Sequence, residues 1–228
     1  MKTLLAMSTG VLVLSLAAAG CKNQSETMTD KKPSQTFATA EQAARKAKDD
    51  LVIVLRGASG LNAGVDAATV EQSVPGKPVR RLDVNFEKLL STESVVTFDV
   101  LGAGERDTIV PLLVGDDVVT VVAVRQDDAG WRVVGSADKG IADDLNTLRR
   151  ALGDDRDSPI TLYEVPNLPA RVYAVNRGGA ELLFTNYGDR FSLREGVEAA
   201  SLAPVLRADA VAFQKEYGEA LKKERLLR

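Results

Sequence analysis

The chain has no histidine, one cysteine and few aromatic residues, which make up 5% of its 228 residues. The lack of histidine excludes Ser-His-Asp and Cys-His catalysis and removes the commonest protein ligand of transition metals. With one cysteine the chain cannot form an internal disulfide, so the folded part must be stabilised by a hydrophobic core. An apolar content of 45% is sufficient for one sizeable domain or two small ones.

The chain also lacks a large excess of either charge. Its 29 Lys and Arg residues stand against 32 Asp and Glu residues, which gives a net charge of -3. A mildly acidic chain argues against nucleic-acid binding and against polybasic attachment to anionic lipid. We therefore expect no nucleic-acid partner, and attachment to a membrane must have another source.

The single cysteine, Cys21, ends a segment with a basic start and an apolar centre. Lys2 opens the segment, residues 4–16 are mostly apolar, and the small residues 17–20 precede the cysteine. This order is typical of secretory signal peptides. The apolar stretch is shorter than the roughly 20 residues that a membrane-spanning helix requires, and Ser, Thr and Gly dilute it.

These features resemble the signal peptide and lipobox of bacterial lipoproteins. The resemblance implies cleavage between Gly20 and Cys21, lipid attached to the Cys21 thiol, and anchoring in the bacterial membrane. Two or three acyl chains make such an anchor effectively permanent. Because Lys22 rather than Asp follows the cysteine, the resemblance also implies the outer membrane, with the protein facing the periplasm. The alternative is an ordinary secretory signal followed by a free thiol.

After the signal peptide, residues 1–20, the chain divides into a tether and a folded part. Residues 21–36 contain the cysteine and then polar residues without an apolar period, a composition typical of a flexible tether. Residues 37–228 alternate helical and strand patterns and are predicted to be globular. They form either one domain or two lobes, 37–152 and 153–228.

The folded part is predicted to begin with two helices. Apolar residues recur at helical spacing from Ala40 to Leu55, behind a capping box formed by Thr39 and Gln42. The predicted helix ends at Gly57. A shorter helix is predicted from Asp66 to Gln72, before a turn at Pro75 to Pro78.

The middle of the chain predicts an antiparallel meander, because β-branched runs alternate with turn signals. Pro111 cannot donate to a β-ladder, so its strand is expected at a sheet edge or with a bulge. Residues 118–124, VVTVVAV, are apolar on both faces and are expected to form a central strand covered on each side. The predicted strands are Val95 to Leu101, Thr108 to Val114, Val118 to Arg125 and Trp131 to Gly135, with a turn at residues 102–104 after the first.

The later part of the chain predicts a helix, three strands and a final helix. Apolar spacings of four, three and four residues mark the helix from Ile141 to Leu152, and Gly153 ends it. The final helix, from Val197 to Leu227, is expected to break near Pro204. The three strands are Ile160 to Val165, Arg171 to Val175 and Ala180 to Thr185.

This order of elements predicts an α+β fold, with antiparallel meander sheets packed against N-terminal, middle and C-terminal helices. The hairpin that ends in Gly130-Trp131-Arg132-Val133-Val134 resembles the last hairpin of cystatin-like and nuclear-transport-factor-like sheets. That resemblance concerns the fold, and no site residue is carried over from it.

Two motifs suggest chemistry. Residues 51–64, LVIVLRGASGLNAG, resemble the strand and glycine loop of a dinucleotide site, but no βαβ alternation follows, which favours a helix stop and a turn. Aspartate pairs could supply calcium ligands or a glycosidase acid and base, yet most stand at predicted turns or helix ends, where Asp bonds nearby backbone N–H groups. We therefore predict no catalytic residue, metal site or cofactor, with calcium left as an alternative. The pairs are Asp49-Asp50, Asp116-Asp117, Asp127-Asp128, Asp143-Asp144 and Asp154-Asp155.

Aromatic residues and arginines are concentrated in the second group of strands, and this combination is typical of binding hot spots. The candidate interaction surface comprises Tyr173, Tyr187, Arg171, Arg177 and Arg190. The alternative is that the aromatic residues belong to the core and the arginines are their solvated neighbours.

The sequence predicts a non-enzymatic envelope lipoprotein that binds another envelope protein. Two alternatives stay open. A carrier or sensor of a lipid, peptide or metabolite requires a deep apolar cavity. A hydrolase that uses carboxylates, Lys, Tyr or Ser requires titratable groups that converge in a cleft.

Overall fold

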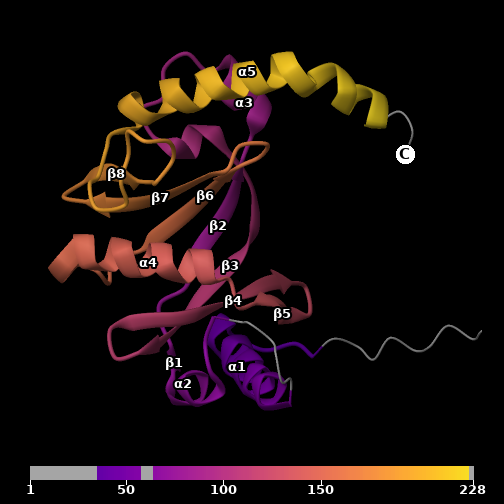
Figure 1. Cartoon of the computed structure of the whole chain (residues 1–228), viewed down its shortest axis with the longest axis vertical. Coiled ribbons are helices and arrows are strands. Elements are labelled where there is room, and N and C mark those ends of the chain that lie inside the picture. Colours follow the sequence, from indigo (N-terminus) through magenta and orange to yellow (C-terminus); the bar gives the residue numbers. More distant parts are fainter. Residues whose placement is uncertain (1–34, 58–63, 226–228) are drawn as a thin grey trace, which may run out of the picture. The chain divides into compact units, whose positions relative to one another are not determined.

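The computed structural model describes residues 35–57 and 64–225 (Figure 1). Gly20, Cys21 and residues 58–63 of the glycine-rich motif lie outside these ranges. The described residues have an α+β fold, with five α-helices and one sheet of eight strands. The helices are α1 (Ala40–Gly57), α2 (Ala67–Gln72), α3 (Phe86–Ser91), α4 (Lys139–Leu152) and α5 (Ala199–Arg225), with short 3-10 helices η1 (Phe98–Leu101) and η2 (Gly153–Asp155).

The strands form a mostly antiparallel sheet in the order β5-β4-β3-β2-β6-β7-β8, and β1 also pairs with β3. The exception is the parallel pair of β2 and β6. This pair joins strands from before and after residue 152 in a single sheet. The strands are β1 (Val74–Pro75), β2 (Val79–Val84), β3 (Gly102–Val114), β4 (Asp117–Asp127), β5 (Gly130–Ser136), β6 (Ile160–Val165), β7 (Ala170–Arg177) and β8 (Ala180–Phe184).

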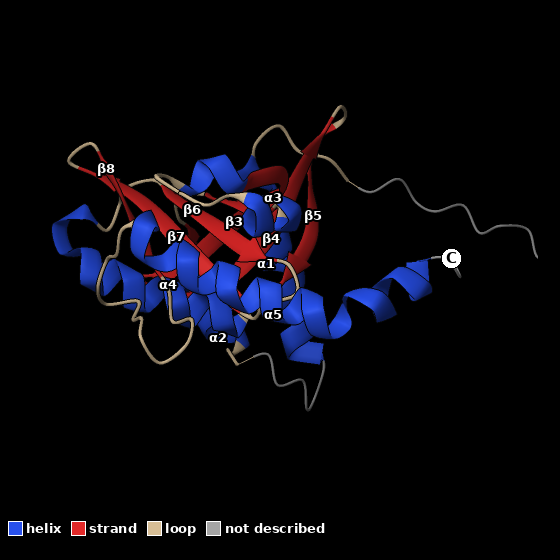
Figure 2. Cartoon of the chain, turned by 90° about the horizontal axis from the view of Figure 1, so that it is seen from above, coloured by secondary structure: helices blue, strands red, loops and turns tan. Residues whose placement is uncertain are grey.

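Helices cover both faces of the sheet (Figure 1 and Figure 2). α4 packs on one face, in a core that includes Leu162 and Val121. The next residues along the same strands, Tyr163 and Val122, point to the opposite face, because side chains alternate along a strand. On that face α3 and α5 cover one half of the sheet, and α1 and α2 cover the other. Residues 118–124 are therefore covered on both sides, as predicted.

The first two helices begin where the sequence predicts. The Gln42 N–H donates to Thr39 Oγ1 at 3.2 Å, and Gln42 Oε1 accepts the Ala38 N–H at 3.2 Å. Ala43 and Ala44 are completely buried, so α1 packs on the sheet through small side chains. α2 follows Asp66, whose carboxylate accepts the Thr69 N–H at 2.9 Å.

The predicted strand from Val95 to Leu101 is wrong. Residues 98–101 form η1, and β3 already begins at Gly102, so the expected turn at residues 102–104 is wrong as well. Phe98 and Leu101 are buried in the core beneath α5. Their spacing of three residues brings both to one side of a helical turn, where sequence analysis expected a strand.

β2 and α3 were not predicted from the sequence. β2 has the sequence VRRLDV, whose charges do not suggest an interior strand. Arg81 Nε lies 2.8 Å from Asp107 Oδ1 on β3, and Arg81 Nη1 lies 3.5 Å from Glu164 Oε1 on β6. Because the two strands that flank β2 supply these carboxylates, the charged strand is tolerated inside the sheet.

Pro111 lies within an interior strand, so its expected place at a sheet edge is wrong. The Pro111 carbonyl accepts the Gly76 N–H at 2.8 Å. The N and C=O of one residue point to the same side of a strand, so the missing N–H faces residues 76–78, between β1 and β2. No ladder bond is lost there. The alternative of a bulge is confirmed by a register shift between Leu112 and Leu113.

The later elements agree with prediction in order and position. Asp138 caps α4, Gly153 ends it with a φ of +57°, and the three predicted strands correspond to β6, β7 and β8. The expected break in the last helix is wrong, because α5 continues through Pro204. Pro204 and Ala200 are both exposed, so the helix gives up the bond between residues 204 and 200 on its solvent side rather than in the core.

Candidate binding grooves along α5

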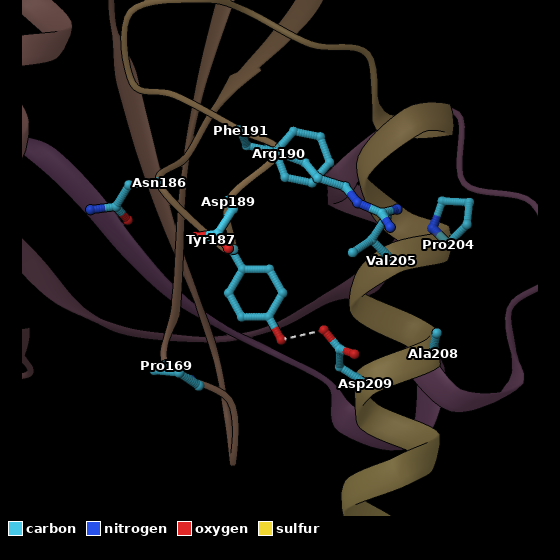
Figure 3. Close-up of a pocket in the computed structure, with 11 residues that line it drawn as sticks. Pro169, Asn186, Tyr187, Asp189, Arg190, Phe191, Pro204, Val205, Ala208 and Asp209 are labelled. Carbon is cyan, nitrogen blue, oxygen red and sulfur yellow. Dashed lines mark hydrogen bonds between the residues drawn. The ribbon is translucent and has the colours of Figure 1, made fainter.

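A solvent-open groove lies between α5 and residues 186–191, which follow β8 (Figure 3). Its volume is about 920 Å³. Small-molecule sites range from roughly 300 to 1,000 Å³, so this space is large enough for a ligand or for several side chains of a partner. We call it groove 1. It is lined by Pro169, Asn186, Tyr187, Gly188, Asp189, Arg190, Phe191, Pro204, Val205, Ala208 and Asp209.

Hydrogen bonds hold the loop wall of groove 1 against the sheet. Thr185 Oγ1 donates to the Arg171 carbonyl at 2.7 Å and accepts the Tyr187 N–H at 3.1 Å. Leu183 and Val197 exchange backbone bonds of 2.9 and 2.8 Å, which returns the chain along β8 before α5 begins. The loop is therefore anchored at both ends, and the side chains between them have defined positions.

Tyr187 joins the two walls of groove 1. Its hydroxyl donates to Asp209 Oδ2 on α5 at 2.7 Å (Figure 3). Burial raises the pKa of Tyr187 to about 12, and the hydrogen bond to the Asp209 carboxylate adds to this effect. The phenol therefore stays protonated at neutral pH and acts as a donor that fixes the distance between loop and helix.

Arg190 supplies a positive charge to groove 1. In Figure 3 its side chain extends from the loop toward α5, whose residues Pro204 and Val205 line the same groove. In the part of the chain that the structure describes, no ion pair joins Arg190 to a carboxylate. A guanidinium group carries five N–H donors in a planar arrangement, so Arg190 can bind carboxylate or carbonyl oxygens of a ligand.

A second groove lies on the other side of α5, against residues 92–95, and has a volume of about 520 Å³. We call it groove 2. Arg207 lines it and donates from Nε to the Leu90 carbonyl at 3.0 Å, which ties α5 to the end of α3. Pro204 and Ala208 line both grooves, so the two spaces meet at these exposed residues. Groove 2 is lined by Leu89, Thr92, Glu93, Ser94, Val95, Ala200, Ala203, Pro204, Arg207, Ala208 and Val211.

The structure brings together two of the five residues predicted for an interaction surface. Tyr187 and Arg190 both line groove 1. Tyr173 is 0% exposed, so its assignment to a surface is wrong. Arg171 and Arg177 stand near opposite ends of β7, where they pair with Asp144 and Asp155, and neither lines groove 1.

Tyr173 is buried because it points from β7 toward α4. Its hydroxyl donates to Asp144 Oδ2 at 2.9 Å, and Arg171 Nη1 lies 3.2 Å from the same oxygen. Desolvation raises the pKa of Asp144, although Arg171 and the Tyr173 hydrogen bond act in the opposite direction. This cluster satisfies buried polar groups between α4 and the sheet, which indicates a structural role.

The α5 wall of groove 1 is not part of the interaction surface predicted from the sequence. A signal was present in Ala200, Pro204 and Ala208, which recur every four residues and give one exposed side of the helix small side chains. Asp209 had no such signal. Its contact with Tyr187 depends on how α5 packs beside the end of β8.

Several paired aspartates lie at the turns where sequence analysis placed them. Asp116 and Asp117 border the turn between β3 and β4 and pair with Arg156 at 2.8 Å and Arg150 at 3.1 Å. Asp127 Oδ1 accepts the Ala129 N–H at 3.0 Å in the next turn. Across residues 35–57 and 64–225, no three His, Cys, Asp or Glu side chains gather closely enough to hold a metal ion.

Comparisons with known proteins find no family model, no curated protein and no solved structure that matches this chain. The geometry of the grooves is therefore the basis for a functional interpretation. Among the described residues, no helix combines the length and the apolar character needed to cross a membrane.

Proposed function

We propose that this protein is a lipid-anchored lipoprotein of the bacterial envelope that binds another envelope protein through groove 1 and catalyses no reaction. The proposed anchor is a lipid attached to Cys21, which holds the protein on the outer membrane, where it faces the periplasm. Residues 21–36 act as the tether. Groove 1 carries the proposal, because it combines apolar walls with a guanidinium group that has no carboxylate partner among the described residues.

The chemistry of groove 1 suits a polypeptide ligand. Phe191, Val205 and Pro169 offer apolar surface, whose burial contributes about 25 cal/mol per Å². Tyr187 and Arg190 belong to the residue types that most often dominate binding energies at protein interfaces. Apolar contacts then supply affinity, while Arg190 orients the partner through carboxylate or carbonyl oxygens.

The protonation state of Tyr187 suits a binding role for groove 1 better than a role in proton transfer. A general acid is most effective when its pKa lies near the working pH. The pKa of Tyr187 is raised to about 12, and its proton is already directed at Asp209. The hydrogen bond between Tyr187 and Asp209 stabilises the groove, and the Tyr187 hydroxyl is poorly suited to give up its proton to a substrate.

A carrier or sensor of a lipid, peptide or metabolite is a second candidate. It is favoured by the volume of groove 1, about 920 Å³, which lies within the range of small-molecule sites. The groove is open along the surface rather than enclosed between sheet and helices. An open groove suits an elongated partner better than a ligand that must be sequestered from water.

Two alanines of α5 provide a matched test. Ala208 and Ala212 are both exposed on the same helix, but only Ala208 lines the grooves. Cells that carry the full-length protein, or its Ala208→Trp or Ala212→Trp variant, are treated with formaldehyde and the cross-linked products are compared. We expect Ala208→Trp to lower the yield of the partner adduct at least tenfold, while Ala212→Trp leaves it unchanged. Equal yields from both variants contradict binding at this surface.

A further inference from the structure

Residues 35–38 cover the outer edge of β5 just before α1 begins, and we call them the strap. β5 is the strand at one end of the sheet, and Phe37 and Trp131 exchange two backbone hydrogen bonds of 2.7 and 2.8 Å on its side away from β4. The approach is close, because a Cβ at Gly130, which has a φ of +122°, would lie 2.8 Å from the Phe37 carbonyl oxygen. The strap therefore closes the sheet edge at Trp131.

Few contacts hold the strap in place. Gln35, Thr36 and Ala38 are exposed, and Phe37 is half-buried, with its side chain packed on the core beneath α1. Among the described residues, the two bonds at Phe37 are the only backbone bonds between the strap and β5. Ordering a residue costs a free energy as large as the net contribution of one hydrogen bond, so the strap is held only weakly.

α1 does not depend on the strap for its first turn. The Gln42 N–H donates to Thr39 Oγ1, and Gln42 Oε1 accepts the Ala38 N–H. Both bonds lie at the C-terminal end of the strap or beyond it, so Phe37 can leave β5 while the helix keeps its cap. The strap can thus move as a unit separate from the helix.

Release of the strap changes what the edge of β5 presents. The backbone groups of successive residues point to opposite sides of a strand, so the N–H and C=O of Trp131 face the strap and those of Arg132 face β4. Val133 and Val134, further along the same strand, are 38% and 41% exposed. Without the strap, the Trp131 groups lose their partner beside exposed apolar side chains, which is the condition that makes a strand edge prone to pairing.

We propose that the strap is a gate on the outer edge of β5, which opens and closes while the rest of the domain stays folded. In the closed state Phe37 occupies the N–H and C=O of Trp131. In the open state these groups face solvent, as they do along a free strand edge. The gate lies at the opposite end of the strand order from β8 and groove 1, so it goes beyond the proposed function and does not rest on it.

Hydrogen exchange of single amides in the full-length chain, followed by NMR, tests the gate. The Trp131 N–H is freed when the strap opens, whereas the neighbouring Arg132 N–H stays bonded to β4 and is the internal control. We expect the protection factor of the Trp131 N–H to be at least about tenfold lower than that of Arg132. Low concentrations of urea should leave it unchanged, because opening the strap exposes little surface. Equal protection with the same urea dependence would mean that the strap leaves β5 only when the domain unfolds, and would overturn the gate.

Two phenylalanines provide matched variants. Phe37→Ala removes the ring and keeps both backbone bonds, so the strap is open more often and the Trp131 protection factor should fall about fivefold. Phe86→Ala removes another half-buried ring, on α3 in the core beneath α5, and should leave the Trp131 protection factor within about twofold. An equal fall in both variants would reflect a loss of stability of the whole domain and would also overturn the gate.

Discussion

Replacing Tyr187 by Phe should weaken the link between the two walls of groove 1. The change deletes the hydroxyl that lies 2.7 Å from Asp209 Oδ2 and keeps the ring. A hydrogen bond to a charged group contributes roughly 1.5–3 kcal/mol when shielded, and less when the partner is exposed, as Asp209 is. We therefore expect a loss of about 1 kcal/mol, which lowers the melting temperature by about 2–4 °C for a domain of this size.

The assay is thermal unfolding of residues 22–228, followed by circular dichroism, for Tyr187→Phe, Asp209→Ala and the double variant. The coupling energy from this cycle should be about 1 kcal/mol, because each single change breaks the same bond. Tyr217→Phe is the control. Its side chain is 46% exposed and it lies outside groove 1, so no measurable change is expected.

The pH dependence supplies an independent check. Folding raises the pKa of Tyr187 from 10.0 to about 12, so the folded protein holds the phenolic proton more tightly than the unfolded chain. The contribution of the protonated Tyr187 hydroxyl to the free energy of unfolding is complete below pH 10 and is lost as the pH rises through 12. The difference between wild type and Tyr187→Phe should therefore be constant from about pH 6 to 9 and shrink above about pH 10. A coupling energy of zero at pH 7 would refute the link.

Three further predictions concern the core, a helix end and the anchor. Asp144→Asn keeps an acceptor for the Tyr173 hydroxyl and removes a carboxylate whose pKa is raised by burial. A carboxylate with a raised pKa stabilises the fold less as the pH rises, so urea unfolding at pH 7 should show the Asn variant to be at least as stable as the wild type. Asp144→Ala leaves the Tyr173 hydroxyl without this acceptor and should lose about 1–3 kcal/mol. Gly153→Ala puts a Cβ at φ +57° and ψ -115° and should cost about 1–3 kcal/mol in the same assay. Cys21→Ser should move the protein from the membrane fraction to the soluble periplasmic fraction, and retention in the membrane would contradict the lipid anchor.

Elements with local stop and start signals could be predicted from the sequence. α1 has its own capping residues, and α4 lies between Asp138 and Gly153. The β7–β8 hairpin turns at residues 178–179, where both glycines have positive φ. In each case the residues that define the element lie within it or beside it in the chain.

Elements and sites that depend on distant partners could not be predicted in the same way. β2 is an interior strand because Asp107 and Glu164 arrive from neighbouring strands to balance Arg81. Tyr173 and Tyr187 have similar arginine-rich surroundings in the sequence. One points beneath α4, while the other lies past the end of β8 and contacts α5. The difference comes from the packing of two helices.

The mass of the molecule that contacts groove 1 in cells distinguishes a protein partner from a lipid or a metabolite. A photoreactive amino acid at Val205 lies within groove 1, and the same residue at Ala212 lies outside it. Irradiation of intact cells should give a polypeptide adduct of one discrete size at position 205 and none at position 212. An adduct of lipid or metabolite mass at position 205, or no more adduct there than at position 212, would contradict binding of a protein partner in groove 1.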